Sequence, residues 1–490
     1  MHGNTLRQSW LWSATVVAGL VAGLAIPQKA AAIPSFARKY QTSCTTCHTV
    51  YPMLNSFGEA FRRNGYRFPS QNGSTDGDAT LAPSLPLGQS EYAKQFPDAV
   101  WPDKIMQAVP LSVWVNGGVS VNLPKSDAEQ AAGNNFTWNN ILSEMHLFGA
   151  GAFDDRVTYF TQLTFASDGL DLETAYLLWN DVLGADQHAL NLWVGRLMAP
   201  SLTSFGGHSS YLSDMATPAV SLAGLFNPNG SFVLGQGHSD GVEANGVLAH
   251  RVGWSVGWLA SMPSTGLKIP NAEDLYAHLG VKLGGMSLDG EGPGGALVAN
   301  AKRPWEETSL TLDAFGYHGM NVLDNGTAST PVGQRSAIDA VGGGLRLNVG
   351  SLIVNAGLQF EQHSHPYQGT PAMGTTAAAP DRRSGNGYTQ FNEVDYVVFP
   401  WFVPGVRTEL THLGESSNVP GTAASLLRIL PGIAFLVRQN IKVVVVGDLE
   451  MAQNLPPAGG WDPAGGLSAP TNAKSSFVAE QVNVNAAWAF

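Results

Sequence analysis

Polar and apolar residues alternate along most of this chain, from about residue 107 to the C-terminus. In 109–116 the odd positions hold Val, Leu, Val and Val, and 157–165 alternates in the same way. A period of two residues is typical of β-strands that have one polar and one apolar face. The pattern therefore predicts an all-β region over this part of the chain.

The apolar stretch 426–451 is the hardest test of this interpretation, because its length also suits a membrane helix. All of its charged residues nevertheless fall on even positions, whereas the odd positions hold Leu427, Ile429, Ile433, Phe435, Ile441, Val443, Val445 and Leu449. Two strands with one polar face explain this separation, whereas a helix embedded in lipid does not. The charged even positions are Arg428, Arg438, Lys442, Asp448 and Glu450.

About 16 such strands can be traced between residues 107 and 490, which is the size range of bacterial porins. Their connections alternate between tight turns, as near 438–440, and long loops rich in Gly, Pro, Ser and Thr, as at 453–475. Outer-membrane barrels have short periplasmic turns and long extracellular loops. The segment 285–307 is an exception, because it is long but falls on the short-turn side.

The chain ends in an alternating strand whose last residue is the aromatic Phe490. This end resembles the terminal strand of bacterial outer-membrane barrels, where the final aromatic residue acts as an assembly signal. We therefore predict a transmembrane antiparallel β-barrel of about 16 strands over 106–490. The alternative is a soluble all-β protein, which the loop asymmetry argues against.

The N-terminus predicts export. Arg7 precedes the apolar run 11–26, and three alanines at 30–32 provide small residues for cleavage. This order is typical of a signal peptide over 1–32, and the run is shorter than the roughly 18 apolar residues of a membrane anchor. The formal net charge of −12 becomes −14 when Arg7 and Lys29 are removed, which argues against a nucleic-acid partner.

The two cysteines of the chain lie three residues apart in the sequence Ser43-Cys44-Thr45-Thr46-Cys47-His48. In this CxxCH motif both thiols lie on one side of a helical turn, where they can add to the two vinyl groups of one haem c. The next residue, His48, is then the proximal ligand of the haem iron. A zinc site would need further Cys or His ligands at short spacing, and the next histidine is His146.

The residues after the motif predict a small helical haem-packing unit, so that the fold combines the barrel with an N-terminal α-helical haem c domain. A helical stretch begins at Pro52, carries two arginines near its end and stops at Asn64-Gly65. Its apolar residues recur at helical spacing: Leu54, Phe57, Ala60 and Phe61.

Two features of this unit leave alternatives open. Arg62 and Arg63 fit a solvated helix end, which we favour, or contacts with haem propionates. The distal ligand of the iron is not assigned by the sequence. Its candidates are Met53, Met106, Met145 and His146, each of which also fits a packing or lumen position.

With both parts in view, the sequence resembles the fused monohaem cytochrome–porins of bacterial outer membranes, which include the outer-membrane cytochromes of iron-oxidising bacteria. Besides the CxxCH motif, the likeness rests on Ile33-Pro34-Ser35-Phe36-Ala37-Arg38, on Tyr51-Pro52-Met53-Leu54-Asn55-Ser56-Phe57-Gly58 and on Phe96-Pro97-Asp98-Ala99-Val100-Trp101-Pro102.

We predict that residues 33–105 form a monohaem cytochrome c domain, which is of a size to plug a wide barrel. The resemblance implies that extracellular Fe(II) donates electrons, which pass through one haem to a periplasmic cytochrome or copper protein. Whether the chain is then an enzyme, an iron(II):cytochrome c oxidoreductase, is left open. The other partner that this interpretation implies is outer-membrane lipid.

Two other functions compete with iron oxidation. One is extracellular electron transfer with another donor or in the reverse direction, against which the single CxxCH motif argues. The other is a transport porin whose haem domain is a structural plug, because the charged face of 426–451 also suits a pore.

Overall fold

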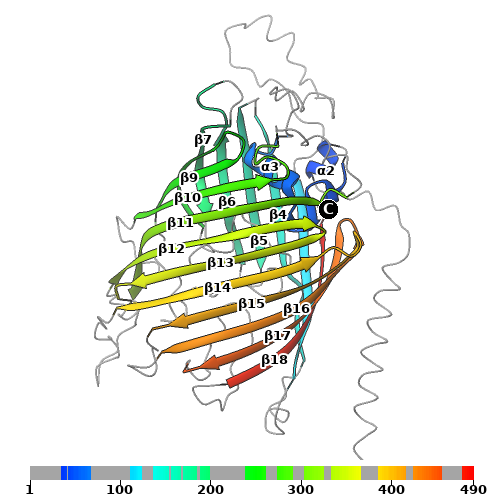
Figure 1. Cartoon of the computed structure of the whole chain (residues 1–490), viewed down its shortest axis with the longest axis vertical. Helices are drawn as coiled ribbons and strands as arrows, with labels where there is room; N and C mark the ends of the chain where they lie inside the picture. Colours follow the sequence, from blue (N-terminus) through cyan, green and yellow to red (C-terminus); the bar gives the residue numbers. More distant parts are fainter. Residues whose placement is uncertain are drawn as a thin grey trace, which may run out of the picture.

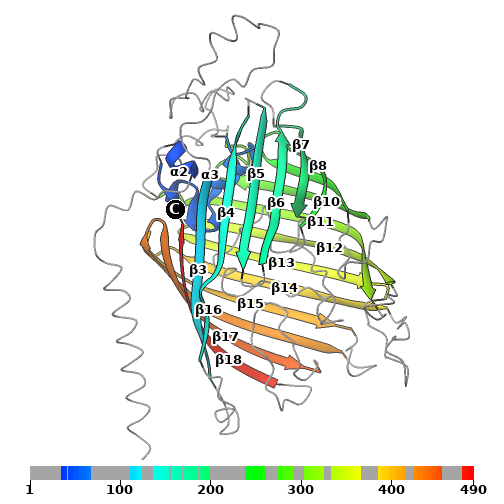
Figure 2. The same ribbon diagram turned by 180° about the vertical axis from the view of Figure 1, so that it is seen from behind.

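Sixteen antiparallel strands form one closed barrel in the computed structural model (Figures 1 and 2). The structure describes residues 35–40, 42–67, 111–123, 136–153, 156–166, 169–184, 188–198, 238–260, 273–290, 303–324, 333–365, 384–414, 423–454 and 477–489. The first eight barrel strands are β3 (Leu111–Asn122), β4 (Phe136–Ala152), β5 (Val157–Ala166), β6 (Gly169–Trp179), β7 (Asn191–Met198), β8 (His238–Leu248), β9 (Val252–Ala260) and β10 (Glu273–Gly284). The last eight are β11 (Glu307–Asp324), β12 (Gly333–Gly350), β13 (Leu352–His363), β14 (Gly385–Tyr396), β15 (Phe402–Leu413), β16 (Ala424–Arg438), β17 (Ile441–Gln453) and β18 (Phe477–Ala489).

Each barrel strand pairs with its neighbours in the sequence, and β18 pairs with β3 to close the sheet. The closing register places Val482 opposite Val121 and Trp488 opposite Val115. Closure leaves no strand edge unpaired, which is the condition for a sheet that spans lipid. The prediction of an all-β barrel of about 16 strands is confirmed.

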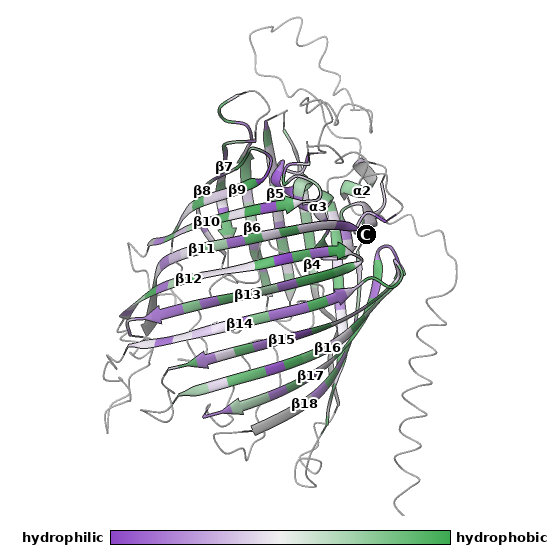
Figure 3. Cartoon of the chain, in the orientation of Figure 1, coloured by the Kyte–Doolittle hydropathy of each residue, from purple (hydrophilic) through white to green (hydrophobic). Residues whose placement is uncertain are grey.

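The alternation predicted for 426–451 is confirmed. On β17 the even positions from Lys442 to Ala452 are buried and face the inside of the barrel, whereas the odd positions are half-exposed. Figure 3 shows hydrophilic and hydrophobic segments alternating along the strands. Arg438 differs from the other charged residues, because it lies at the end of β16 and is exposed.

The outward positions form an apolar surface. Leu275, Leu279 and Leu283 on β10 are each about half exposed, and other exposed aliphatic residues follow on β11, β12 and β13. Exposed aromatic residues lie at one end of the strands: Phe153, Trp179, Tyr396, Phe399 and Trp401. An apolar band edged by aromatic residues is the lipid-facing surface expected of a membrane barrel.

The N-terminal residues form small elements inside one end of the barrel, namely α2 (Ser35–Lys39), the 3₁₀ turn η1 (Cys44–Thr46), β1 (His48–Val50), β2 (Met53–Leu54) and α3 (Ser56–Arg63). The prediction that a helix begins at Pro52 is wrong. Residues 48–54 form the β1–β2 hairpin, and α3 begins only after Asn55, whose side-chain oxygen accepts a hydrogen bond from the Gly58 amide. The predicted stop at Asn64-Gly65 is confirmed, since Gly65 has φ of +67°.

Residues 35–67, which we call the plug, lie at the short-turn end of the barrel (Figures 1 and 2). Its β1–β2 hairpin packs against the wall strands from β13 to β17 in an apolar cluster that we call the plug–wall core. Met53 of the plug is fully buried in it. The plug–wall core consists of Val50, Met53, Trp305, Ile353, Val397, Val403, Leu430, Ala434, Val444 and Val446.

The long connection on the short-turn side, which the loop rule did not explain, packs against the plug. Met286 is buried against Phe57 and Ala60, and Trp305 belongs to the plug–wall core. The described parts of this connection are 285–290 and 303–306. The two described ends of this connection therefore pack against the plug.

Several predictions lie outside the described residues, namely the signal peptide 1–32, the boundary at 105/106, Phe490 and most of the long loops. Within the described residues, no helix has both the length and the apolar character needed to cross a membrane.

The outward alternation predicts a measurable effect at the centre of β10. Replacing the exposed Leu279 with Arg places a charge against the lipid and should destabilise the barrel by about 2–4 kcal/mol. Leu279→Ala, which keeps the surface apolar, should cost much less. The measurement is denaturant unfolding in lipid vesicles. Equal stabilities of the two variants would contradict a lipid-facing position for Leu279.

Candidate functional site

The structure brings Cys44, Cys47 and His48 together on one short turn. Cys44 begins η1, and the Cys47 amide donates to the Cys44 carbonyl at 3.2 Å. Both thiols are free and half-buried, and His48 follows directly as the first residue of β1. Burial raises the pKa of the Cys47 thiol to about 12 and also raises that of Cys44. The turn therefore presents two neutral thiols within one helical turn.

One ring nitrogen of His48 is held by the protein. Its Nδ1 lies 3.2 Å from the carbonyl oxygen of Pro52, which can only accept a hydrogen bond. The proton is thereby placed on Nδ1, and Nε2 keeps the lone pair that a metal ligand needs. Burial lowers the pKa of His48 to about 4, so the ring is neutral at ordinary pH. This is the protonation state of an iron-binding imidazole.

Asn55 organises the turn that carries the motif. Its Oδ1 accepts from the Gly58 amide, and its Nδ2 donates to the carbonyls of Thr45 and Thr46 at 3.1 and 3.0 Å. Its backbone amide donates to the Cys47 carbonyl. One buried side chain thus joins the start of α3 to the turn. The sequence analysis missed this role, although an Asn just before a helix is a common N-cap signal.

Gly58 allows α3 to pack closely on the motif. A Cβ at this position would lie 2.2 Å from the Cys47 carbonyl oxygen, which is too close for any side chain. Cys47 also packs against the cluster of Phe57, Ala60 and Met286. The long connection after β10, through Met286, therefore contributes to the surroundings of the motif.

Hydrogen bonds from the wall strands hold the plug on several sides. On β17 and β18, the Lys442 ammonium donates to the Tyr51 carbonyl at 2.6 Å, and the Tyr51 hydroxyl donates to the Ala487 carbonyl at 2.5 Å. On β12, Arg346 donates to the Leu54 carbonyl at 2.9 Å.

A second polar group holds the start of α3. On β10, the Lys282 ammonium lies 2.7 Å from Ser56 Oγ and 3.0 Å from Glu307 on β11. Ser56 also donates to Glu307. These contacts cover a sector of the wall different from the one that holds Tyr51.

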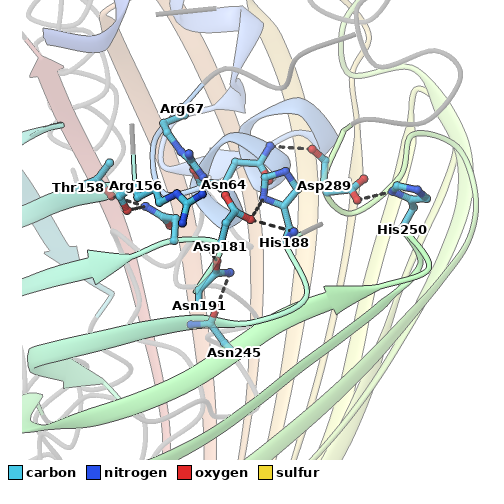
Figure 4. Close-up of polar contacts among 11 residues, drawn as sticks. Asn64, Arg67, Arg156, Thr158, Asp181, His188, Asn191, Asn245, His250 and Asp289 are labelled. Carbon is cyan, nitrogen blue, oxygen red and sulfur yellow. Dashed lines mark hydrogen bonds and ion pairs between the residues drawn. The ribbon is translucent and has the colours of Figure 1, made fainter. Parts of the chain in front are cut away.

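The end of the plug is tied by polar contacts to the β6–β7 connection and to the long connection after β10 (Figure 4). Arg67 forms an ion pair of 2.9 Å with Asp181, and both side chains are almost fully buried. Asn64 donates to the Asp289 carbonyl at 2.8 Å, and the Asp289 carboxylate contacts His250. Gly65 faces Asn180 so closely that a Cβ would lie 2.3 Å from its Oδ1.

Aromatic packing covers the remaining side of the plug. Tyr66 stacks on Phe160 of β5 with ring centroids 5.1 Å apart, and its hydroxyl lies 2.9 Å from that of Tyr176 on β6. Tyr176 in turn stacks on Trp193 of β7 at 5.2 Å. The plug therefore contacts the wall around most of its circumference.

The candidates for a distal ligand lie in different surroundings. Met53 is buried in the plug–wall core, and Met145 is exposed on the outer surface of β4. His146 faces the inside, where its Nδ1 lies 2.8 Å from Thr164 and its ring stacks on Trp114. Met106 lies outside the described residues. The outward position of Met145 removes it from the candidates.

The preference for a solvated helix end at Arg62 and Arg63 is wrong, because both side chains are largely enclosed by the barrel. Only 19% of the Arg62 side chain is exposed, and it pairs with Glu59 at 3.6 Å. Within the described part of the chain, the buried Nε atoms of both arginines have no hydrogen-bond partner. The pair thus retains donors for an anionic group.

The interior beyond the plug carries a buried ionic network. Arg428 on β16 pairs with Glu409 on β15 and with Asp448 and Glu450 on β17, at 2.7–3.4 Å. Arg407 pairs with Glu409 at 2.6 Å. Across the described ranges, no group of three or more His, Cys, Asp or Glu residues is arranged to hold a metal ion.

The barrel identifies the compartment. A closed barrel with 16 strands, an apolar outer surface and a polar interior is the architecture of bacterial outer-membrane proteins. The chain is an outer-membrane β-barrel. By the rule that short turns are periplasmic, the plug lies at the periplasmic end.

No protein-family model and no curated protein matches the chain, but solved structures of outer-membrane proteins do. In-vitro folded OmpT, an outer membrane protein of Vibrio cholerae, is 11% identical, covers 78% of this chain and 96% of its own, and has a TM-score of 0.49. The anion-selective porin from Comamonas acidovorans has the same identity and coverage of this chain, covers 98% of its own, and has a TM-score of 0.48. The barrel assignment rests on the strand pairing of this chain.

The contacts of Asn55 predict a graded loss of order in the motif. Asn55→Ala removes the helix cap and both bonds to the turn and should destabilise the plug locally by about 2–3 kcal/mol. Asn55→Asp keeps the cap but loses the amide donors, so its effect should be smaller. The measurement is hydrogen exchange at the Gly58 amide. Identical exchange in the two variants would contradict a separate role for the cap.

The Arg67–Asp181 pair predicts a local effect at the end of the plug. Arg67→Ala leaves a buried carboxylate without its cation and should cost about 3–5 kcal/mol. The matched control is Arg303→Ala, because Arg303 pairs with Glu306 at an exposed site, where about 0–1 kcal/mol is expected. The measurement is hydrogen exchange at residues 64–67. Unchanged exchange in Arg67→Ala would show that the ion pair does not hold the plug.

Proposed function

We propose that this chain is an outer-membrane cytochrome c that holds one haem c through thioether bonds from Cys44 and Cys47, with His48 as the proximal ligand. The observation that carries the proposal is the hydrogen bond between His48 Nδ1 and the Pro52 carbonyl within a CxxCH turn. A turn with two thiols and an imidazole whose Nε2 is left for iron is the donor set of a covalently attached haem.

Each neighbouring residue has a defined part in this proposal. Asn55 keeps the two thiols and His48 in one geometry, and Gly58 lets α3 approach the turn. Arg62 and Arg63 would bind the propionates through their enclosed guanidinium groups. The bound haem supplies one-electron chemistry between Fe(III) and Fe(II) at the periplasmic end of the barrel.

We further propose that extracellular Fe(II) is the electron donor and that a periplasmic cytochrome or copper protein is the acceptor. The resemblance to the fused cytochrome–porins supports the donor. The position of the plug at the short-turn end supports the direction, because that end of an outer-membrane barrel faces the periplasm, where soluble carriers are found, while the opposite end carries the extracellular loops. Oxidation on that side also keeps poorly soluble Fe(III) out of the periplasm.

A transport porin is the second candidate, and the buried ionic network of Arg407 and Arg428 favours it, since charged residues line the interior of pores. The contacts around the plug argue against it. A plug that is held by hydrogen bonds to β6, β10, β12 and β17 does not move aside easily to let solutes pass.

The first test concerns covalent haem. The double variant Cys44→Ala/Cys47→Ala should lose every haem-stained band that survives denaturation, whereas His146→Ala should keep it. A haem-stained band in the double variant would exclude attachment through these thiols. Wild-type protein without covalent haem would favour the transport porin.

The second test concerns the donor. Stopped-flow spectroscopy should show reduction of the oxidised haem within seconds of mixing with Fe(II), and reoxidation by a periplasmic acceptor. Ready reduction by another donor, without reduction by Fe(II) at any pH, would support extracellular electron transfer with that donor instead. Efficient solute flux through the reconstituted protein would support transport.

A further inference from the structure

Lys442 is a buried lysine on β17 that contacts the plug beside the haem-binding motif. It is 1% exposed, its ammonium lies 2.6 Å from the Tyr51 carbonyl oxygen and 4.7 Å from the centroid of the Tyr51 ring, and the Trp114 ring lies 5.9 Å away. A carbonyl dipole and two aromatic faces stabilise a cation. The wall of the barrel thus places a positive charge against the plug.

The chain links this charge closely to His48. Tyr51, whose carbonyl contacts the ammonium, directly precedes Pro52, whose carbonyl holds His48 Nδ1. The two carbonyls are consecutive in the turn of the β1–β2 hairpin. One peptide unit therefore separates the carbonyl that contacts the ammonium from the carbonyl that holds His48.

We propose that Lys442 raises the reduction potential of the haem, an inference that rests on the proposed haem attachment through Cys44 and Cys47. Reduction of the haem iron adds one negative charge, and a buried cation nearby stabilises the reduced form over the oxidised form. The interior of the protein screens such charges weakly. A higher potential makes electron uptake from a weak reductant such as Fe(II) more favourable.

The charge that is proposed to shift the reduction potential comes from the barrel wall and not from the plug itself. The motif lies on a compact turn of the plug, and β17 contributes Lys442, whose backbone amide and side-chain ammonium both contact Tyr51. The haem would therefore reach its working potential only when the plug is seated in the barrel. In this proposal Lys442 is a positioning and tuning residue.

The test is spectroelectrochemical titration of the haem in the full-length protein in detergent. Lys442→Met keeps the length of the side chain and removes the charge, and should weaken electron uptake about tenfold, the order expected for one charge at roughly 10 Å in a medium of effective dielectric constant about 20. For a one-electron couple this is a potential lower by about 59 mV. If Lys442→Met does not accumulate, Lys442→Gln, which keeps a donor for the Tyr51 carbonyl, should show the same direction.

Two controls separate charge from docking. Lys442→Arg retains the charge, and Tyr51→Phe removes the hydroxyl contacts to Ala487 and Lys442 but leaves the ammonium in place. Both should keep a potential near that of the wild type. An unchanged potential in Lys442→Met, or an equal decrease in both controls, would overturn the proposal. Absence of covalent haem from the wild type would overturn the proposed function, which the haem-stained gel detects separately.

Discussion

The width of a 16-stranded barrel is the constraint on which the rest of this structure depends. Barrels of this size enclose an interior that the side chains of their own wall do not fill. Here the short-turn end is filled by residues 35–67, which contribute Val50 and Met53 to the plug–wall core. Long polar side chains of the wall strands, such as Lys442 and Arg346, donate hydrogen bonds to backbone carbonyls of the plug. Barrel closure and plug docking therefore stabilise each other.

The barrel could be predicted from the sequence because lipid-facing and interior-facing residues alternate regularly along its strands. Lipid outside and polar groups inside impose a two-residue alternation on the strands. The even positions of the charges in 426–451 therefore indicated which side chains face the interior. The turn that carries Cys44, Cys47 and His48 could be predicted, because cysteines three residues apart lie on one helical turn; the haem that this spacing implies stays a proposal. The start of α3 was misplaced because Pro52, which suits the first turn of a helix, lies instead in a tight hairpin.

The contacts between plug and wall could not be predicted, since they join residues hundreds of positions apart. Tyr51 donates a hydrogen bond to Ala487, and Arg67 forms an ion pair with Asp181. Neither contact produces a recognisable pattern in the local sequence. Arg62 and Arg63 resembled a solvated helix end because the barrel strands that enclose them are also far away in the sequence. These contacts argue against a movable gate, because buried ion pairs and carbonyl contacts are costly to break.

The central claim is that the plug carries one covalently bound haem at the periplasmic end of an outer-membrane barrel. Trypsin cleaves after Lys39 and Arg62, so the motif is released within the single peptide 40–62. The most direct measurement is the mass of this peptide from protein purified out of native outer membranes. The account predicts the peptide mass plus one haem, with both cysteines modified. The mass of the unmodified peptide, with two free thiols, would contradict it.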